Sequence, residues 1–154
     1  MPFFDDPELI AEKEREENAN FVSEATSSDF TIAITETQTV SSGYFGMSSY
    51  TLYKLETRCS LPGYDPNVMY SALRRFSDFT WLHEKLSATE AYKGFIIPSL
   101  PQKKYIFNFD PNFIEQRKNE LEEYLNILAG HKFVRFDPQL KTFLTVADPQ
   151  EFED

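Results

Sequence analysis

Three short stretches of strand-type sequence, joined by brief links, most constrain the fold of this chain. In the first, Phe30, Ile32 and Ile34 alternate with small residues, which predicts a half-buried strand because successive strand side chains point to opposite faces. The second runs from Tyr50 to Cys59 and is rich in aromatic and β-branched residues, and the third runs from Met69 to Phe76. Consecutive strands with short links favour an antiparallel three-stranded meander.

A first long helix is expected directly after the third strand. Ser77 is a candidate cap because its hydroxyl can accept a hydrogen bond from an otherwise unpaired amide. Phe79, Leu82 and Leu86 then recur at helical spacing. We expect this helix to end near Ala91.

A second long helix has clear start and stop signals. Pro111 fits the first helical position if Asp110 is the cap, whereas Glu115 completes a capping box if Asn112 is the cap instead. Gly130 is expected to end the helix. Its apolar stripe consists of Leu121, Tyr124, Leu125 and Leu128.

A short closing helix is expected to begin at Asp137 and Pro138 and to contain Leu140, Phe143 and Leu144. The chain is therefore expected to be α+β, with a three-stranded antiparallel meander packed against a helical subdomain. A proline-rich loop separates the first two long helices.

Charge is distributed unevenly over the 154 residues. The net charge of −10 is carried by the two ends, since residues 1–24 have a net charge of −6 and residues 148–154 one of −4. We expect an acidic mobile tail over residues 1–27, one domain over residues 28–146, and an acidic C-terminal tail or linker start over residues 147–154. The neutral middle can carry a local basic patch, but it lacks the broad positive face of a nucleic-acid-binding protein.

Several motifs bear on the cellular compartment. Neither a signal peptide nor an apolar run of about 18 residues is present, and the single Cys59 suits a reducing compartment, so we expect a cytoplasmic protein. The segment from Asp5 to Ile10 fits an acidic-dileucine adaptor motif, or equally a stray helical turn.

Two adjacent arginines, Arg74 and Arg75, precede Phe76 at the junction of the third strand and the first helix. A guanidinium group is a permanently charged, planar fork of donors that matches phosphate oxygens. The motif therefore indicates a site for a phosphorylated ligand with an apolar ring face. The alternative is that both arginines are solvated strand residues.

The stretch from Ile96 to Tyr105 contains a P-x-x-P pattern, which favours a stiff loop that holds Lys103 and Lys104 in place. A plain loop, or a ligand for an SH3-type domain, is the alternative. The apolar residues from Tyr105 to Phe109 that follow must be buried, contact a partner, or enter a bilayer interface.

Arg117 lies one turn before Leu121 on the apolar stripe of the second long helix. A permanent charge is thus predicted to face the domain near a helix start, where the macrodipole disfavours cations. This placement requires an anionic partner, which is either a buried carboxylate or an external phosphate or hydroxyl group.

Together these motifs resemble the phox-homology (PX) domain of the sorting nexins. The residues that carry the resemblance are Arg74-Arg75-Phe76-Ser77-Asp78-Phe79, then Pro98-Ser99-Leu100-Pro101-Gln102-Lys103, then Phe113-Ile114-Glu115-Gln116-Arg117-Lys118. The likeness spans about residues 28–146. It implies the PX fold and phosphoinositide binding, most often to phosphatidylinositol 3-phosphate on early endosomes.

The resemblance also implies a role for each site residue. Arg75 would bind the 3-phosphate, Phe76 the underside of the inositol ring, Lys103 the 1-phosphate, and Arg117 the hydroxyl groups at positions 4 and 5. Arg74 and Lys104 are expected as secondary basic residues, and Ile106 and Phe107 as the residues that insert into the membrane. Family members often have Tyr in place of Phe76 and Pro in place of Ser99, but neither change removes a charged contact.

The expected function is therefore membrane targeting in endosomal sorting and vesicle trafficking, peripheral on the cytosolic face of endosomes, with sorting-coat or cargo proteins as further partners. A protein-recognition module without lipid specificity is the alternative. An enzyme is not expected, because no nucleophile–base pair or phosphate-cradling glycine-rich loop is visible. We expect no cofactor and no metal site, since His83 and His131 lack partners at ligand spacing.

Overall fold

The computed structural model of the chain describes residues 29–41, 49–103 and 109–147. Three strands form one sheet in the order β1 (Phe30–Val40), β2 (Tyr50–Cys59) and β3 (Tyr70–Arg75), and both pairings are antiparallel. The predicted meander is thus confirmed. The first strand is longer than its alternating part, and its register with β2 shifts between Ile34 and Glu36.

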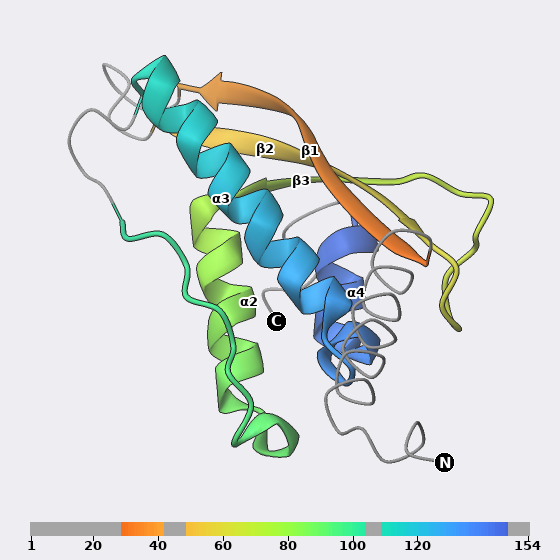
Figure 1. The fold of residues 1–154 in the computed structure, drawn as a ribbon. Coiled ribbons are helices and arrows are strands. Elements are labelled where there is room, and N and C mark those ends of the chain that lie inside the picture. Colours follow the sequence, from red (N-terminus) through yellow and green to blue (C-terminus); the bar gives the residue numbers. More distant parts are fainter. Residues whose placement is uncertain (1–28, 42–48, 104–108, 148–154) are drawn as a thin grey trace, which may run out of the picture.

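The helices cover one face of this sheet (Figure 1). α2 (Phe76–Ala88) is followed by the short 3-10 helix η3 (Glu90–Tyr92), and α3 (Pro111–Gly130) by the second 3-10 helix η4 (Val134–Phe136) and by α4 (Pro138–Thr145). The predicted α+β arrangement is confirmed. No helix in the described part of the chain is both long and apolar enough to span a bilayer.

The helix boundaries follow from their capping residues. The Asp110 carboxylate accepts from the amides of Asn112 (2.8 Å) and Phe113 (3.2 Å), so Asp110 caps α3, with Pro111 in the first turn. Asp137 caps α4 in the same way. Both helices therefore begin where the sequence predicted.

The prediction for the start of α2 was wrong. Arg75 occupies the cap position, and the Asp78 carboxylate accepts a hydrogen bond from the Arg75 backbone amide at 2.9 Å. The carboxylate of Asp78, the third residue of the helix, thus binds the amide of the cap residue, and the helix begins two residues earlier than a Ser77 cap would place it. As a result, the last strand residue of β3 is immediately followed by helix, and Ser77 is exposed.

The core lies between the sheet and the helices. Phe30, Ile32 and Ile34 of β1 point into it, as predicted. It also contains the apolar faces of the three helices: Phe79, Leu82 and Leu86 from α2, Leu121, Tyr124, Leu125 and Leu128 from α3, and Leu140, Phe143 and Leu144 from α4. Because α2 and α3 pack on this shared core, the junction of β3 with α2 has a fixed position relative to the start of α3.

Side chains of α3 also bind the outer edge of β1. Asn126 donates to the Ile32 carbonyl (2.9 Å) and accepts from its amide (3.4 Å), and Glu122 accepts from the Ile34 amide (2.8 Å). An edge strand otherwise presents unpaired backbone groups to other chains. Here the helix occupies that edge around Ile32 and Ile34.

Candidate functional site

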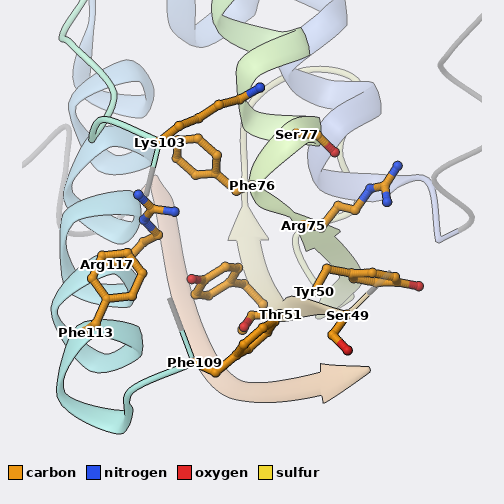
Figure 2. Close-up of a pocket in the computed structure, with 11 residues that line it drawn as sticks. Ser49, Tyr50, Thr51, Arg75, Phe76, Ser77, Lys103, Phe109, Phe113 and Arg117 are labelled. Atoms are coloured by element: carbon orange, nitrogen blue, oxygen red, sulfur yellow. The ribbon is translucent and has the colours of Figure 1, made fainter. Parts of the chain in front are cut away.

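A cavity of about 360 Å³ opens where β3 meets α2, across from the first turns of α3. Figure 2 shows Arg75 on one side of it and Arg117 on the other, with Phe76 between them. Its described lining residues are Ser49, Tyr50, Thr51, Tyr53, Arg75, Phe76, Ser77, Lys103, Phe109, Phe113 and Arg117. This described lining contains three cationic side chains and no acidic one, a composition that suits an anionic ligand.

Arg75 contributes an exposed guanidinium group to this cavity. It leaves the sheet at the last position of β3, and its Cζ lies 5.2 Å from the ring centroid of Tyr50 on β2. Such cation–π contact restrains the guanidinium group without consuming its hydrogen-bond donors. Within the described residues, Arg75 makes no ion pair.

Arg117 is held between two aromatic rings. Its Cζ lies 4.1 Å from the ring centroid of Phe76 and 4.5 Å from that of Phe113, and only 6% of the residue is exposed. One Nη donates to the carbonyl of Gln102, whereas Nε is buried without a hydrogen-bond partner in the described structure. The guanidinium group thus joins α3 to the proline-rich segment.

No described carboxylate forms an ion pair with Arg117. The sequence left two kinds of partner open for Arg117, a buried carboxylate or an external phosphate or hydroxyl group. The buried carboxylate is not found in the described part of the chain. Burial lowers the pKa of Arg117. Burial raises the pKa of Tyr53, which lines the same cavity, and the positive charge of Arg117 opposes that rise. A guanidinium group nevertheless stays protonated in proteins, so a positive charge remains at the cavity wall.

Lys103 completes the set of cations. It follows Gln102, whose carbonyl is bound by Arg117, so the same contact that restrains the loop also restrains the lysine. The lysine is exposed. The structure therefore brings together all four residues predicted for the headgroup: Arg75, Phe76, Lys103 and Arg117.

The prediction that Arg74 is a secondary basic residue of the site is contradicted. Arg74 is completely buried, and its Nε donates to the Phe143 carbonyl at 3.0 Å while its Nη atoms donate to the carbonyls of Leu73 and Val146. Adjacent strand residues face opposite sides of a sheet. Arg74 consequently binds the C-terminal end of α4, and Arg75 alone faces the cavity.

Three other predicted residues, Lys104, Ile106 and Phe107, lie outside the described residues. The sequence analysis also missed residues of the cavity. Phe113 was detectable because it lies four residues before Arg117 on the same helix, a spacing at which side chains are neighbours. Ser49, Tyr50 and Thr51 carried no such signal, since their place beside Arg75 depends on strand register.

His83 has a structural partner, as its Nδ1 lies 3.0 Å from the Tyr124 hydroxyl. Within the described ranges, no group of three or more His, Cys, Asp or Glu side chains is arranged to hold a metal ion.

The chain is similar to proteins of one family. The family model for the PX domain matches residues 64–147. Human sorting nexin-1 is 34% identical over 126 residues, covering 75% of this chain and 23% of its own length. Arabidopsis thaliana sorting nexin 1 is 38% identical over 102 residues, covering 64% of this chain and 24% of its own length. The matching region thus spans about a quarter of the length of these curated relatives.

Solved structures agree with this match. The X-ray structure of a designed CISK-PX domain superimposes with a TM-score of 0.59 at 30% identity and covers 74% of this chain and 97% of its own. The mouse SNX19 PX domain with bound sulphate ion gives a TM-score of 0.57 at 25% identity, with 74% and 93% coverage. The chain therefore belongs to the PX-domain family and is a PX domain of the sorting nexin type.

Proposed function

We propose that this domain binds a phosphoinositide headgroup in the cavity, preferentially that of phosphatidylinositol 3-phosphate, and so attaches to the cytosolic face of endosomes. PX domains of the sorting nexin type are phosphoinositide-binding modules of membrane trafficking. The observation that carries the proposal is the composition of the cavity wall, with Arg75, Lys103 and Arg117 and no described acid. The sulphate ion held by the mouse SNX19 PX domain supports anion binding by this fold.

Each cation suits a different part of the headgroup. The exposed fork of Arg75 can pair with the 3-phosphate dianion, and Lys103 supplies a point charge for the 1-phosphate diester. The unused donors of Arg117 suit the hydroxyl groups at positions 4 and 5. Phe76 offers an aromatic surface for the apolar face of the inositol ring.

The parts of the chain outside this cavity have proposed roles too. We infer a lipid-binding domain over residues 28–146 with acidic segments over residues 1–27 and 147–154. Lys104 adds positive charge beside Lys103, and Ile106 and Phe107 enter the bilayer. Sorting-coat or cargo proteins are the further partners, and the chain acts by binding, with no cofactor, rather than by catalysis.

A protein-recognition module without lipid specificity is less well supported. Part of one strand edge is already engaged, since Glu122 and Asn126 bind the backbone of β1 at Ile32 and Ile34. Such a module would also have no use for a cavity lined by three cations.

The test is liposome pelleting with the full chain, using vesicles that contain each phosphoinositide in turn. We expect preferential pelleting with phosphatidylinositol 3-phosphate, and we expect Arg75→Ala to weaken it by about 2–5 kcal/mol, the usual range for a lost charge-assisted contact. Arg58→Ala is the matched control, because Arg58 is an exposed arginine at the other end of β2. Equal binding by the folded Arg75→Ala and Arg58→Ala variants would refute the site.

A further inference from the structure

A second surface of the domain is unusually apolar for exposed residues. Ile96, Phe136 and Phe133 are 92%, 59% and 52% exposed, the three highest values among the large hydrophobic residues in the described part of the chain. Phe133 stacks on Phe95 with 5.4 Å between ring centroids, and Phe136 lies three residues further on, across the turn of η4. We call Phe95, Ile96, Lys132, Phe133, Arg135 and Phe136 the aromatic patch.

Positive charge accompanies these rings. Lys132 Nζ lies 5.5 Å from the Phe133 ring centroid, and Arg135 Cζ lies 5.8 Å from that of Phe136. Within the described residues Lys132 forms no ion pair, and the nearest acid along the chain, Asp137, is buried and already caps α4 while accepting from the Tyr92 hydroxyl. A ligand of this patch should therefore combine apolar side chains with carboxylates.

The patch lies at the opposite end of the helices from the cavity. Arg117 is in the cavity wall and Gly130 ends the same helix, so the helical rise between them is about 20 Å. Figure 1 shows η3 and the C-terminal end of α3 together at the end of the molecule away from the junction of β3 and α2. Under the proposed function, a domain whose cavity faces a bilayer presents this patch to the cytosol, where a polypeptide is the fitting ligand.

The chain itself contains a segment of the required chemistry. Residues 1–24 have a net charge of −6 and include three apolar pairs, Phe3-Phe4, Leu9-Ile10 and Phe21-Val22. The described domain starts beside the end of β2, where the Asp29 carbonyl accepts from the Ser60 amide at 2.9 Å. Burial raises the pKa of the adjacent Cys59 thiol, and the charges of Arg135 and Asp29 both act on it, so Arg135 lies close to where residues 1–28 join the domain.

We propose that the acidic N-terminal segment, residues 1–28, docks on the aromatic patch of its own chain, with carboxylates beside Lys132 and apolar side chains over Phe133 and Phe136. Covalent attachment at Asp29 gives the segment a high effective concentration at this surface. Docking covers the exposed rings. It also keeps six units of net negative charge at the end of the domain away from the cationic cavity, where they would repel an anionic membrane.

The test uses the isotope-labelled full chain with a nitroxide on the cysteine introduced by Asn18→Cys, in a Cys59→Ala background that leaves one reactive thiol. We expect broadening of the amide signals of Ile96, Phe133 and Phe136 at low salt, and loss of that broadening when Lys132→Glu is combined with Phe133→Ser. The matched control combines Lys118→Glu with Leu73→Ser, one charge reversal and one exposed apolar residue elsewhere, and should retain the broadening.

Other patterns of broadening would overturn the proposal. Broadening at Arg75 and Phe76 would place the segment in the cavity instead. Broadening that appears only when labelled and spin-labelled molecules are mixed would indicate docking on a second copy, and uniform weak broadening would indicate no docking. Because the experiment contains no lipid, its outcome is independent of the proposed headgroup site.

Discussion

At the scale of single residues, two adjacent arginines on β3 have separate tasks. The exposed Arg75 faces the cationic cavity, whereas Arg74 is buried and donates to carbonyl groups at the end of α4. Carbonyls in the last turn of a helix have no partner within the helix, and a guanidinium group can satisfy several of them at once. Arg74 thus contributes to stability, whereas binding is the role that we propose for Arg75.

We predict that Arg74→Met lowers the free energy of unfolding by about 3 kcal/mol, because it removes charged donors from the buried carbonyls of Phe143 and Val146. The folded variant should keep its affinity for soluble inositol 1,3-bisphosphate. Denaturant unfolding and calorimetric titration measure the two quantities. Arg75→Met is the control with the opposite expected outcome, so a loss of affinity in Arg74→Met would return Arg74 to the binding site.

We propose that Arg117 combines both roles. Its guanidinium group lies between Phe76 and Phe113 and binds the Gln102 carbonyl, and a lysine cannot reproduce such a stacked, forked arrangement. We predict that Arg117→Lys reduces stability by about 1–2 kcal/mol and also weakens headgroup binding, as measured by thermal unfolding and calorimetric titration.

Phe113→Leu is the control for this prediction, since it removes one ring while all three cations remain. It should lower stability with a smaller effect on affinity. If Arg117→Lys instead abolished binding with stability unchanged, the stacking would be incidental and the guanidinium group would act on the ligand alone.

At the scale of the elements, α3 protects the edge of β1 through Asn126. We predict that Asn126→Ala lowers the free energy of unfolding by about 1–2 kcal/mol, because the amide and carbonyl of Ile32 lose their partner. The Ile32 amide should also exchange its hydrogen faster. Asn119→Ala, on an exposed position of the same helix, should change neither quantity. Unaltered exchange at Ile32 in the Asn126→Ala variant would show that the edge is protected by other groups.

Most elements were predictable from the sequence because their signals are local. Alternating apolar residues determine β1, and the Asp-Pro pairs at Asp110 and Asp137 determine where α3 and α4 begin. The inward orientation of Arg117 was also predictable, since it shares a helical stripe with Leu121. These features depend on residues within one or two turns of each other.

Features that depend on pairing between distant segments were not predictable. In β3, Leu73 is 40% exposed while Arg74 is buried, so the apolar pattern of the strand suggests the reverse of the actual orientation. The contact between Tyr50 and Arg75 likewise depends on the register of β2 with β3. The cap of α2 was predicted wrongly because Ser77, a typical capping residue, lies beside Asp78, whose carboxylate accepts the actual hydrogen bond.

At the scale of the whole molecule, the fold buries Tyr124 in its core and packs the partly buried Tyr64 against it. Burial raises the pKa of Tyr64 and of Tyr124 well above the usual value. In the unfolded chain these groups would ionise near pH 10. The contribution of these two neutral hydroxyl groups to the free energy of unfolding is therefore fully present below about pH 10. It is lost as the pH rises further.

We accordingly predict that the free energy of unfolding falls above about pH 10, by at most about 1.4 kcal/mol per pH unit for each such tyrosine. Denaturant unfolding at a series of pH values measures it. The buried Tyr64 hydroxyl has no hydrogen-bond partner among the described residues, so Tyr64→Phe should cost no stability at pH 7 and should reduce the alkaline slope. A slope unchanged by Tyr64→Phe would assign the alkaline loss to other groups.

Under the proposed function, we expect the segment between Lys103 and Phe109 to orient the whole domain on a bilayer. Both of these residues line the cavity, and Phe109 is 41% exposed. Residues 104–108 lie outside the described residues, and in the sequence Ile106 and Phe107 are at most three residues from Lys103 or Phe109. Each large apolar side chain that fully enters the interfacial layer could add roughly 1.5–3 kcal/mol to membrane binding.

We predict that combining Ile106→Ser with Phe107→Ser reduces liposome binding severalfold and leaves affinity for soluble inositol 1,3-bisphosphate nearly unchanged, because only the bilayer contact is removed. Liposome pelleting and calorimetric titration distinguish the two. The control combines Phe133→Ser with Phe136→Ser, two exposed rings at the far end of the helices, and should pellet normally. Equal loss in both assays, or a lower melting temperature for Ile106→Ser with Phe107→Ser, would mean that these side chains stabilise the fold and that another surface meets the membrane.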